Sequence, residues 1–279
     1  MNEQRKKELK KLSLEAKKQI IIGTNSAKSG HPGGSLSCTD ILTYLYWDKM
    51  NIDPANPKKS DRDRFVLSKG HAAPALYSVL AVRGFFPIDE IKKLRKPNAI
   101  LQGHPDKKNI PGVDMSSGSL GQGISAATGM ALSAKHFGDS YRVYSIIGDG
   151  ESEEGQVWEA AMFAAHKKLD NLTVFVDLNN LQIDGTIDEV NSPLPLDKKF
   201  EAFNWNVIVI DGHDFDQIEA AVSAAEKCKG KPTVIIANTV KGKDVSFMEN
   251  KVGWHGSAPN DEQAAEALKE LEAKIAELN

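Results

Sequence analysis

Asp149, in the stretch "SIIGDGESEEG", has the residue type and the position of a metal ligand beside a bound anion. It follows an apolar run of strand length, and its neighbours Gly148 and Gly150 let the backbone approach a bulky group closely. A helix expected directly after this turn would present free N–H groups, which suit an anion such as a diphosphate. Because a carboxylate repels a diphosphate, the pattern predicts a divalent cation, Mg²⁺ or Ca²⁺, between the two.

A second polar pair, Asn179 and Asn180, follows the next apolar run, "NLTVFVDL", and begins 30 positions beyond Asp149. One strand–helix–strand unit takes roughly that length. Asn179 offers a side-chain oxygen, and the turn after it offers a backbone carbonyl. Each motif is common alone, but together, at the ends of consecutive strands, they predict a shared site for a metal and a diphosphate.

Four histidines adjoin glycines in predicted loops: His31, His71, His104 and His255. Placed in a cleft, such groups can exchange protons with sugar hydroxyls near neutral pH. The other three are interpreted as ordinary surface or core residues, and no role is predicted for them: His136, His166 and His213.

The elements that position these residues alternate along the second half of the chain. Four apolar, β-branched runs of strand length occupy 141–148, 171–178, 204–212 and 231–239. Helical patterns separate them at 151–168, in part of 192–203, and at 214–228. Strands that are apolar on both faces and alternate with helices predict an α/β fold, with a mostly parallel sheet covered by helices on both faces. In such a sheet, ligands bind at the carboxyl ends of the strands.

The first half and the tail add further helices. Helical spacing predicts one helix over 3–28, a glycine-rich loop at 29–34, and a second helix from near Leu36 to Tyr46. A last helix is expected over about 260–278, with Asn260 as its cap and Gln263 three residues on. With no internal repeat and no low-complexity linker, we expect a single domain spanning 1–279.

Composition excludes several classes of protein. The chain has 35 Lys and Arg against 38 Asp and Glu, so a net charge of −3 gives no reason to expect nucleic acid or an anionic membrane as a partner. Its two cysteines, Cys38 and Cys228, form neither a disulfide framework nor a zinc site. No stretch approaches the ~18 apolar residues that span a bilayer. We therefore expect a cytoplasmic protein.

The sequence resembles a known family. GDG followed by Asn-Asn about 30 residues later is similar to the signature of thiamine-diphosphate enzymes. Five further segments resemble, in order, segments of transketolase: "SGHPGGSLS", "LSKGHAAPALY", "GHPD", "SSGSLGQG" and "WHGSAP". The resemblance runs from about residue 10 to 260 and implies the thiamine-diphosphate-binding fold, in its diphosphate-binding domain.

The resemblance also assigns roles to residues. It implies that Asp149, Asn179 and the backbone carbonyl of Leu181 hold the metal, and that the N–H of Gly150 binds the diphosphate. His71 and His255 would contact the diphosphate side of the cofactor. His31 and His104 would face the substrate, with His255 near both.

The resemblance implies further roles for a glycine-rich loop and for an acid near Asp149. Gly118 and Leu120 belong to a loop that resembles the one running close to the cofactor rings. Glu154 matches a glutamate in a carboxylate network that links two cofactor sites across a dimer interface. Glu151 and Glu153 are interpreted as ordinary acids of a first helical turn.

The resemblance implies the N-terminal subunit of a split transketolase of the pentose phosphate pathway. Together with a separate C-terminal subunit, it would transfer a two-carbon ketol unit from a ketose phosphate to an aldose phosphate. A dimer of this chain within a heterotetramer is expected. Three alternatives stay open: another thiamine-diphosphate ketol or acyl transferase, such as one like deoxyxylulose phosphate synthase; a non-catalytic cofactor-binding subunit; and a fragment of a longer enzyme.

Overall fold

The computed structural model describes residues 1–278 and is built around one parallel sheet of five strands. The order of the strands is β1-β2-β3-β5-β4, and all neighbours run parallel. Their bounds are β1 Arg64–Leu67, β2 Val143–Gly148, β3 Leu172–Leu178, β4 Asn206–Asp211 and β5 Thr233–Asn238. The predicted parallel α/β fold is confirmed, and each of the four apolar runs contains one strand.

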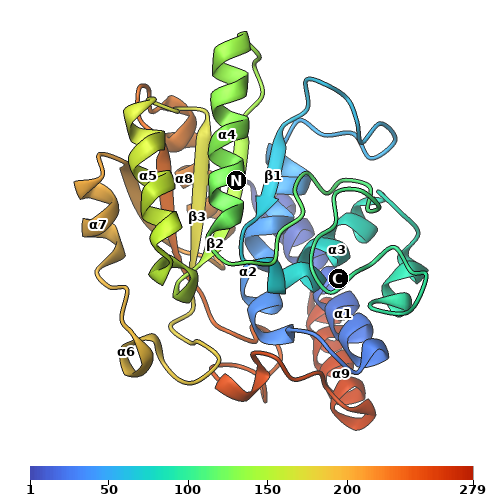
Figure 1. Ribbon diagram of the computed structural model, residues 1–279. Helices are drawn as coiled ribbons and strands as arrows, with labels where there is room; N and C mark the ends of the chain where they lie inside the picture. Colours follow the sequence, from blue (N-terminus) through green and yellow to red (C-terminus); the bar gives the residue numbers. More distant parts are fainter. Residues whose placement is uncertain (279) are drawn as a thin grey trace.

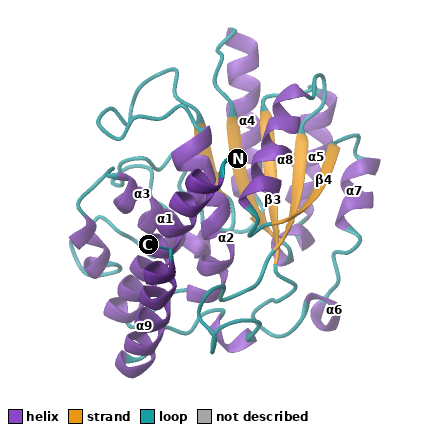
Figure 2. Cartoon of the chain, turned by 180° about the vertical axis from the view of Figure 1, so that it is seen from behind, coloured by secondary structure: helices purple, strands orange, loops and turns teal. Residues whose placement is uncertain are grey.

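Helices cover both faces of the sheet, as Figures 1 and 2 show from opposite sides. One face packs against α4 Gln122–Phe137, α5 Gly155–His166 and α7 Leu196–Ala202. On the other face, α8 Phe215–Lys227 packs against β4, and the same hydrophobic cluster includes α2 Pro32–Tyr44, α1 Glu3–Ala27, α3 Ala73–Arg83 and α9 Asp261–Glu277, of which α3 and α9 pack on α1. A short helix, α6 Ile187–Val190, lies in the connection after β3.

Successive residues of a strand enter different hydrophobic clusters. In β3, Phe175 packs into the cluster beneath α1, α2 and α8, whereas Val174 and Val176 pack into the cluster beneath α4 and α5. All three side chains are fully buried. Side chains of a strand alternate between faces, so burial on both sides explains why these runs read as continuously apolar.

Two helix starts differ from the sequence prediction. Helix α2 begins at Pro32 instead of near Leu36, so Gly33 and Gly34 form its first turn. Proline is well suited to this position because the first N–H groups of a helix have no partner inside the helix. After β2, a 3₁₀ turn spans Gly150–Glu153, and α5 begins only at Gly155 instead of at 151.

The terminal helix agrees closely with its prediction. In α9, the side chain of Asn260 accepts a hydrogen bond from the N–H of Gln263, and the side chain of Gln263 accepts one from the N–H of Asn260. This is the reciprocal cap that the sequence indicated. Figure 1 shows α9 alongside α1, which joins the two ends of the chain in one layer.

Candidate active site

The carboxyl ends of β2 and β3 bring the two predicted metal-binding segments together. Gly148 pairs with Asp177 in the sheet, so the residues that follow each strand meet at the same edge. The Asp149 carboxylate accepts a hydrogen bond from the N–H of Asn180 at 2.6 Å and another from the N–H of Gly150 at 2.8 Å. The two segments, far apart in the sequence, are thus in direct contact.

The oxygen atoms at this edge fit a hard divalent cation. Asp149 is 3% exposed, and burial together with the charge of Asp177 raises the pKa of its carboxyl to about 6. A nearby cation would stabilise the ionised carboxylate and so offset this rise in its pKa. Among the described residues, the one hydrogen bond that Asn179 Oδ1 accepts is a long one of 3.2 Å, from the N–H of Leu181. One carboxylate, one amide oxygen and one backbone carbonyl form a donor set that suits Mg²⁺ or Ca²⁺ when phosphate oxygens add to it.

Asp177 fixes the orientation of the Asn179 side chain. Its Oδ2 accepts a 3.3 Å hydrogen bond from Asn179 Nδ2, so Oδ1 is the amide atom that could serve as a metal ligand. Asp177 is fully buried and also accepts from Lys69 Nζ, Ser37 Oγ and Thr239 Oγ1. Burial would raise the pKa of this carboxyl, but Lys69 and the hydroxyl donors outweigh burial and lower it. Asp177 is therefore ionised, and it holds the Asn179 side chain in one orientation.

A cavity of about 140 Å³ lies directly above these residues. Its lining includes Asp149, Gly150, Asn179 and Leu181, together with His71, His255 and Leu120. Most of the residues predicted for the metal and the cofactor therefore share one cavity. Glu154 does not line it, since this side chain is exposed at the start of α5. Gly118 also stands outside the lining and packs against the ring of His104.

Three of the four predicted histidines form a cluster, in which His71 and His255 line the cavity and His31 packs against them outside its lining. The ring centroids of His31, His71 and His255 are 5.2 to 5.6 Å apart. His104 is more exposed and lies beside Gly118 on the long loop after α3, while Tyr77 donates a 2.6 Å hydrogen bond to its backbone carbonyl. Two histidines for which no role was predicted, His136 on α4 and His166 on α5, are exposed and outside the cavity.

Burial keeps these imidazoles neutral near pH 7. It lowers the pKa of His31 to about 4 and that of His255 to about 3, with nearby cations adding to the effect. The pKa values of His71 and His104 are also lowered, first by burial and then by neighbouring basic groups. A neutral imidazole has one donor and one acceptor nitrogen, which is the form needed to take or give a proton.

Two buried lysines, which the sequence interpretation missed, also line the cavity. Lys69 follows β1 and Lys241 lies just beyond β5, and both side chains are 1% exposed. Lys241 Nζ donates to the carbonyl of Leu181 at 2.9 Å and lies 2.8 Å from His255 Nδ1. Burial and Lys69 lower the pKa of Lys241 to about 8. Their sequence signal is the one that identified Asp149, namely a polar residue just after an apolar strand.

Glu151 corrects the interpretation of the acids that follow Asp149. It is 2% exposed and not an ordinary acid of a helical turn. Its carboxylate accepts hydrogen bonds from the N–H of Gly121 at 2.8 Å, the N–H of Gly148 at 3.0 Å and Ser68 Oγ at 2.5 Å. Glu151 thereby ties the loop that carries Leu120 to the ends of β1 and β2. Burial raises its pKa against these hydrogen bonds.

Glu153 likewise has a specific role. Its carboxylate accepts from the side-chain amides of Gln182 and Asn191, so it holds the segment after β3. Gln182 lines the cavity beside Gly150. The acids behind Asp149 thus fasten the loops on both sides of the cavity.

Comparison with known proteins identifies the family. Residues 12–276 match the family described as "Transketolase, thiamine diphosphate binding domain". The chain is 47% identical to the 6-deoxy-6-sulfo-D-fructose transketolase subunit SqwG of Clostridium sp. (strain MSTE9), over 95% of this chain and 94% of that one. It is 40% identical to one subunit of the apulose-4-phosphate transketolase of Phocaeicola vulgatus, over 94% and 93% of the two chains.

Comparison with solved structures leads to the same family. The transketolase of Campylobacter jejuni superposes with a TM-score of 0.87 at 30% identity, covering 100% of this chain and 46% of that one. The chain thus corresponds to the part of a transketolase that binds thiamine diphosphate, and the relatives that it matches along nearly their whole length are named as subunits. Such matches support the transketolase interpretation over the other thiamine-diphosphate transferases. The chain belongs to the transketolase family, as a thiamine-diphosphate-binding N-terminal subunit.

Proposed function

We propose that this chain binds thiamine diphosphate with Mg²⁺ in the cavity above Asp149. With a C-terminal subunit, it would transfer a two-carbon ketol unit from a ketose to an aldose phosphate. The observation that carries the proposal is the meeting of Asp149, Asn179 and the Leu181 carbonyl beside two buried lysines. When bound, thiamine diphosphate supplies the carbanion chemistry for breaking and forming the carbon–carbon bond.

The chain's own residues would bind and orient this cofactor. Asp149, Asn179 and the Leu181 carbonyl would hold the metal, because their oxygens gather at the ends of β2 and β3. Lys241 would balance part of the diphosphate charge, and Gly150 and Lys69, although Lys69 is paired with Asp177, also line the cavity beside it. Leu120 and Ile183 would contact the apolar parts of the cofactor, since both line the cavity.

The histidines would handle protons at the substrate. His31 lies against His71 and His255 and has an Nδ1 that makes no hydrogen bond within residues 1–278. His104 lies nearer the solvent on the neighbouring loop. As neutral imidazoles, His31, His104 and His255 can accept a hydroxyl proton from one sugar and return it to another.

A partner chain is proposed on two grounds. Pockets that enclose a drug-sized ligand have volumes of about 300–1,000 Å³, so a cavity of about 140 Å³ would enclose only part of the cofactor. The relatives are also named as subunits of transketolases. A second chain would therefore cover the rest of the cofactor and contribute further residues to the active site.

The donor sugar is left to experiment because the relatives' names differ. One relative is named for 6-deoxy-6-sulfo-D-fructose and another for apulose 4-phosphate. Both names describe a ketose that carries an anionic group, and this class is the proposed donor. A panel of these two sugars and xylulose 5-phosphate, each with an aldose phosphate as acceptor, would identify it.

A dimer of this chain through α4 and α5 is also proposed. On these helices Phe137 is 74%, Met162 is 62% and Phe163 is 41% exposed, an unusual concentration of large apolar side chains. Glu154 is exposed at the start of α5, one of these two helices. Two copies of this chain joined in this way, each with one partner chain, would form the expected heterotetramer. Within residues 1–278, no helix is long and apolar enough to cross a membrane. The location that we propose, the cytoplasm, is the one expected from the sequence.

Replacing Asp149 tests the metal site. In the assembled enzyme, Asp149→Ala should weaken thiamine diphosphate binding in the presence of Mg²⁺ by at least about 10–100-fold, because the only carboxylate of the donor set is lost. The measurement is a calorimetric titration of the cofactor. Asp139→Ala is the matched control, since Asp139 is exposed after α4 and does not line the cavity. Equal affinities of the Asp149 variant and the wild type would refute the assignment.

A further inference from the structure

The turn of residues 240–244 holds Lys241 in the cavity and is anchored at both ends. Lys241 lies between Val240, whose N–H donates to His213 Nε2 at 2.9 Å, and Asp244, which is 5% exposed. From this turn the lysine side chain reaches the Leu181 carbonyl and His255. The position of the ammonium group therefore depends on how the two anchors hold the backbone.

His213 is the anchor at the Val240 end. It lies between β4 and α8, and its side chain is 11% exposed. Its Nδ1 is 2.7 Å from Asp40 Oδ2 on α2. A backbone N–H can only donate, so Nε2 must accept from Val240 and Nδ1 must carry the proton that is donated to Asp40. Both ring nitrogens are thus used in one fixed tautomer.

Asp40 is itself held firmly, which makes it a suitable support. This carboxylate is fully buried and accepts hydrogen bonds from Ser13 Oγ at 2.5 Å and from Lys17 Nζ at 3.1 Å. Lys17 also donates to Asp244 Oδ2 at 2.7 Å, and Lys274 Nζ lies 3.1 Å from Asp244 Oδ1. One buried ion-pair network therefore fixes both ends of the turn, with His213 as its link to Val240.

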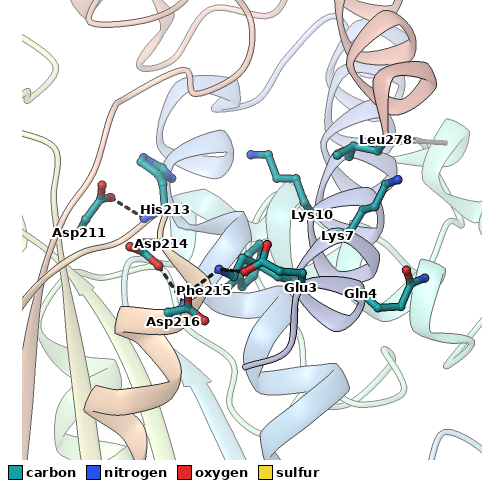
Figure 3. A pocket seen from close by; sticks show the side chains of 11 residues that line it. Glu3, Gln4, Lys7, Lys10, Asp211, His213, Asp214, Phe215, Asp216 and Leu278 are labelled. Atoms are coloured by element: carbon teal, nitrogen blue, oxygen red, sulfur yellow. Dashed lines mark hydrogen bonds and ion pairs between the residues drawn. The ribbon is translucent and has the colours of Figure 1, made fainter.

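Figure 3 shows the outer side of this arrangement. His213 stands with Asp211 and Lys10 on the wall of a hollow of about 670 Å³ between α1 and the start of α8. The charged groups around it are mostly paired within the chain: the N–H of His213 donates to Asp211, Lys10 pairs with Asp244, and Lys6 pairs with Asp216. The contacts through which His213 can affect the cavity are its hydrogen bonds with Asp40 and with the N–H of Val240.

We infer that His213 is a positioning residue for cofactor binding, acting on Lys241 through the backbone of Val240. By holding that N–H, it keeps the Lys241 ammonium beside the Leu181 carbonyl, next to the position at which the metal and the diphosphate would be bound. The inference rests on the proposed function, since Lys241 matters to the reaction only if the cavity binds thiamine diphosphate. It assigns a role to a histidine outside the cavity, for which the sequence predicted none.

Two substitutions of His213 separate its two hydrogen bonds. His213→Asn keeps an amide nitrogen near the Nδ1 position, to donate to Asp40, but has no group at the Nε2 position. His213→Gln reaches the Nε2 position with an oxygen that can accept from Val240. In the assembled enzyme we expect His213→Asn to weaken thiamine diphosphate binding about five- to tenfold, the equivalent of one hydrogen bond, and His213→Gln to bind nearly as the wild type does.

A double-mutant cycle with Lys241→Gln distinguishes positioning from a general loss of stability. If His213 acts through Lys241, His213→Asn should have little further effect on cofactor affinity in the Lys241→Gln background. At saturating cofactor, kcat of His213→Asn should approach the wild-type value while the cofactor KM is raised. Equal losses in both backgrounds, or wild-type affinity in His213→Asn, would overturn the inference. A wild-type enzyme that binds no cofactor would instead overturn the proposed function, and the inference with it.

Discussion

At the scale of single residues, the site depends on buried charges that are paired below the cavity floor. Asp177 and Lys69 are almost completely buried and contact each other, and Asp177 also orients Asn179. Removing one partner of a buried pair leaves an uncompensated charge, which costs more than the pair itself contributes.

Asp177→Asn should therefore lower the free energy of unfolding by about 3–5 kcal/mol, because Lys69 loses its counter-charge. The double variant Asp177→Asn with Lys69→Met should recover much of this loss, since it removes both charges. Urea unfolding of the wild type and the two variants measures the effect. A single variant as stable as the wild type would show that the pair is not the support described here.

The buried histidines predict a specific loss of stability in acid. The ordinary pKa of His31 in the unfolded chain is 6.5, whereas burial lowers its folded pKa to about 4. Between these values the unfolded state binds a proton that the folded state does not, so stability falls as the pH is lowered from 6.5 to about 4. His31→Gln should make the dependence shallower over this range. Unfolding free energies measured across the range check this, and identical slopes for both proteins would contradict it.

The sequence predicted the residues that carry a local signal and missed those that do not. Asp149 and Asn179 were identifiable because glycines and strand ends surround them. Asp177 was not, because it lies within an apolar run and its partners Ser37 and Thr239 are distant in the sequence. Glu151 was missed because acids in a first helical turn are common, and only its contacts with Gly121 and Ser68 reveal its role.

At the scale of elements, the close packing of α4 on β1 places the loop that carries Leu120. Gly123, in the first turn of α4, packs so tightly that an added Cβ would be 2.5 Å from Ser68 Cα. The nearby Ser68 side chain accepts from the N–H of Ile124 and donates to Glu151. The glycine is thus required for the approach of helix and strand.

Gly123→Ala should destabilise the protein by about 1–3 kcal/mol through overpacking and should also weaken cofactor binding. Gly129→Ala is the matched control on the same helix, because an added Cβ there meets nothing within 4 Å. That change should leave stability unchanged or raise it by up to about 1 kcal/mol. Thermal unfolding compares the two. Equal effects of the two alanines would contradict the packing described for Gly123.

The elements were largely predictable, and their ends were less so. Hydrophobic pattern identified the four later strands and α1, α8 and α9, because burial on one or both faces fixes the spacing of apolar residues. The start of α2 was misjudged because its glycines were taken as helix breakers. Gly34 instead lies within a helix, with His71 Nε2 and Lys69 Nζ 3.5 and 3.7 Å from the position of an added Cβ. Such tertiary crowding leaves no mark in local sequence.

At the scale of the whole molecule, the chain has one well-covered layer and one exposed apolar surface. Helices α1 and α9 lie together over one side, whereas α4 and α5 form the outer surface of the other (Figures 1 and 2). The exposed Met162 and Phe163 on α5 are the side chains that a second copy would cover under the proposed assembly. No pattern in the sequence specified this surface, since exposure of apolar residues depends on how the helices pack.

Met162→Glu should shift the enzyme from dimer to monomer of this chain, because it buries a charge at the proposed interface without a partner. Sedimentation velocity measures the change. Ile88→Glu is the control, since Ile88 is 45% exposed on the segment between α3 and α4, away from α5. An unchanged assembly in Met162→Glu would place the interface elsewhere.

The assignment as a two-chain transketolase is tested most directly by a coupled ketol-transfer assay with thiamine diphosphate and Mg²⁺, using xylulose 5-phosphate as donor and ribose 5-phosphate as acceptor. It would be repeated with the two donors named for the relatives. The assay would be run on this chain alone and on this chain with the proposed C-terminal partner. We predict ketol transfer only in the mixture and only with cofactor present. Turnover by the chain alone, or no turnover in the mixture with any of these donors, would contradict the assignment of a two-chain transketolase.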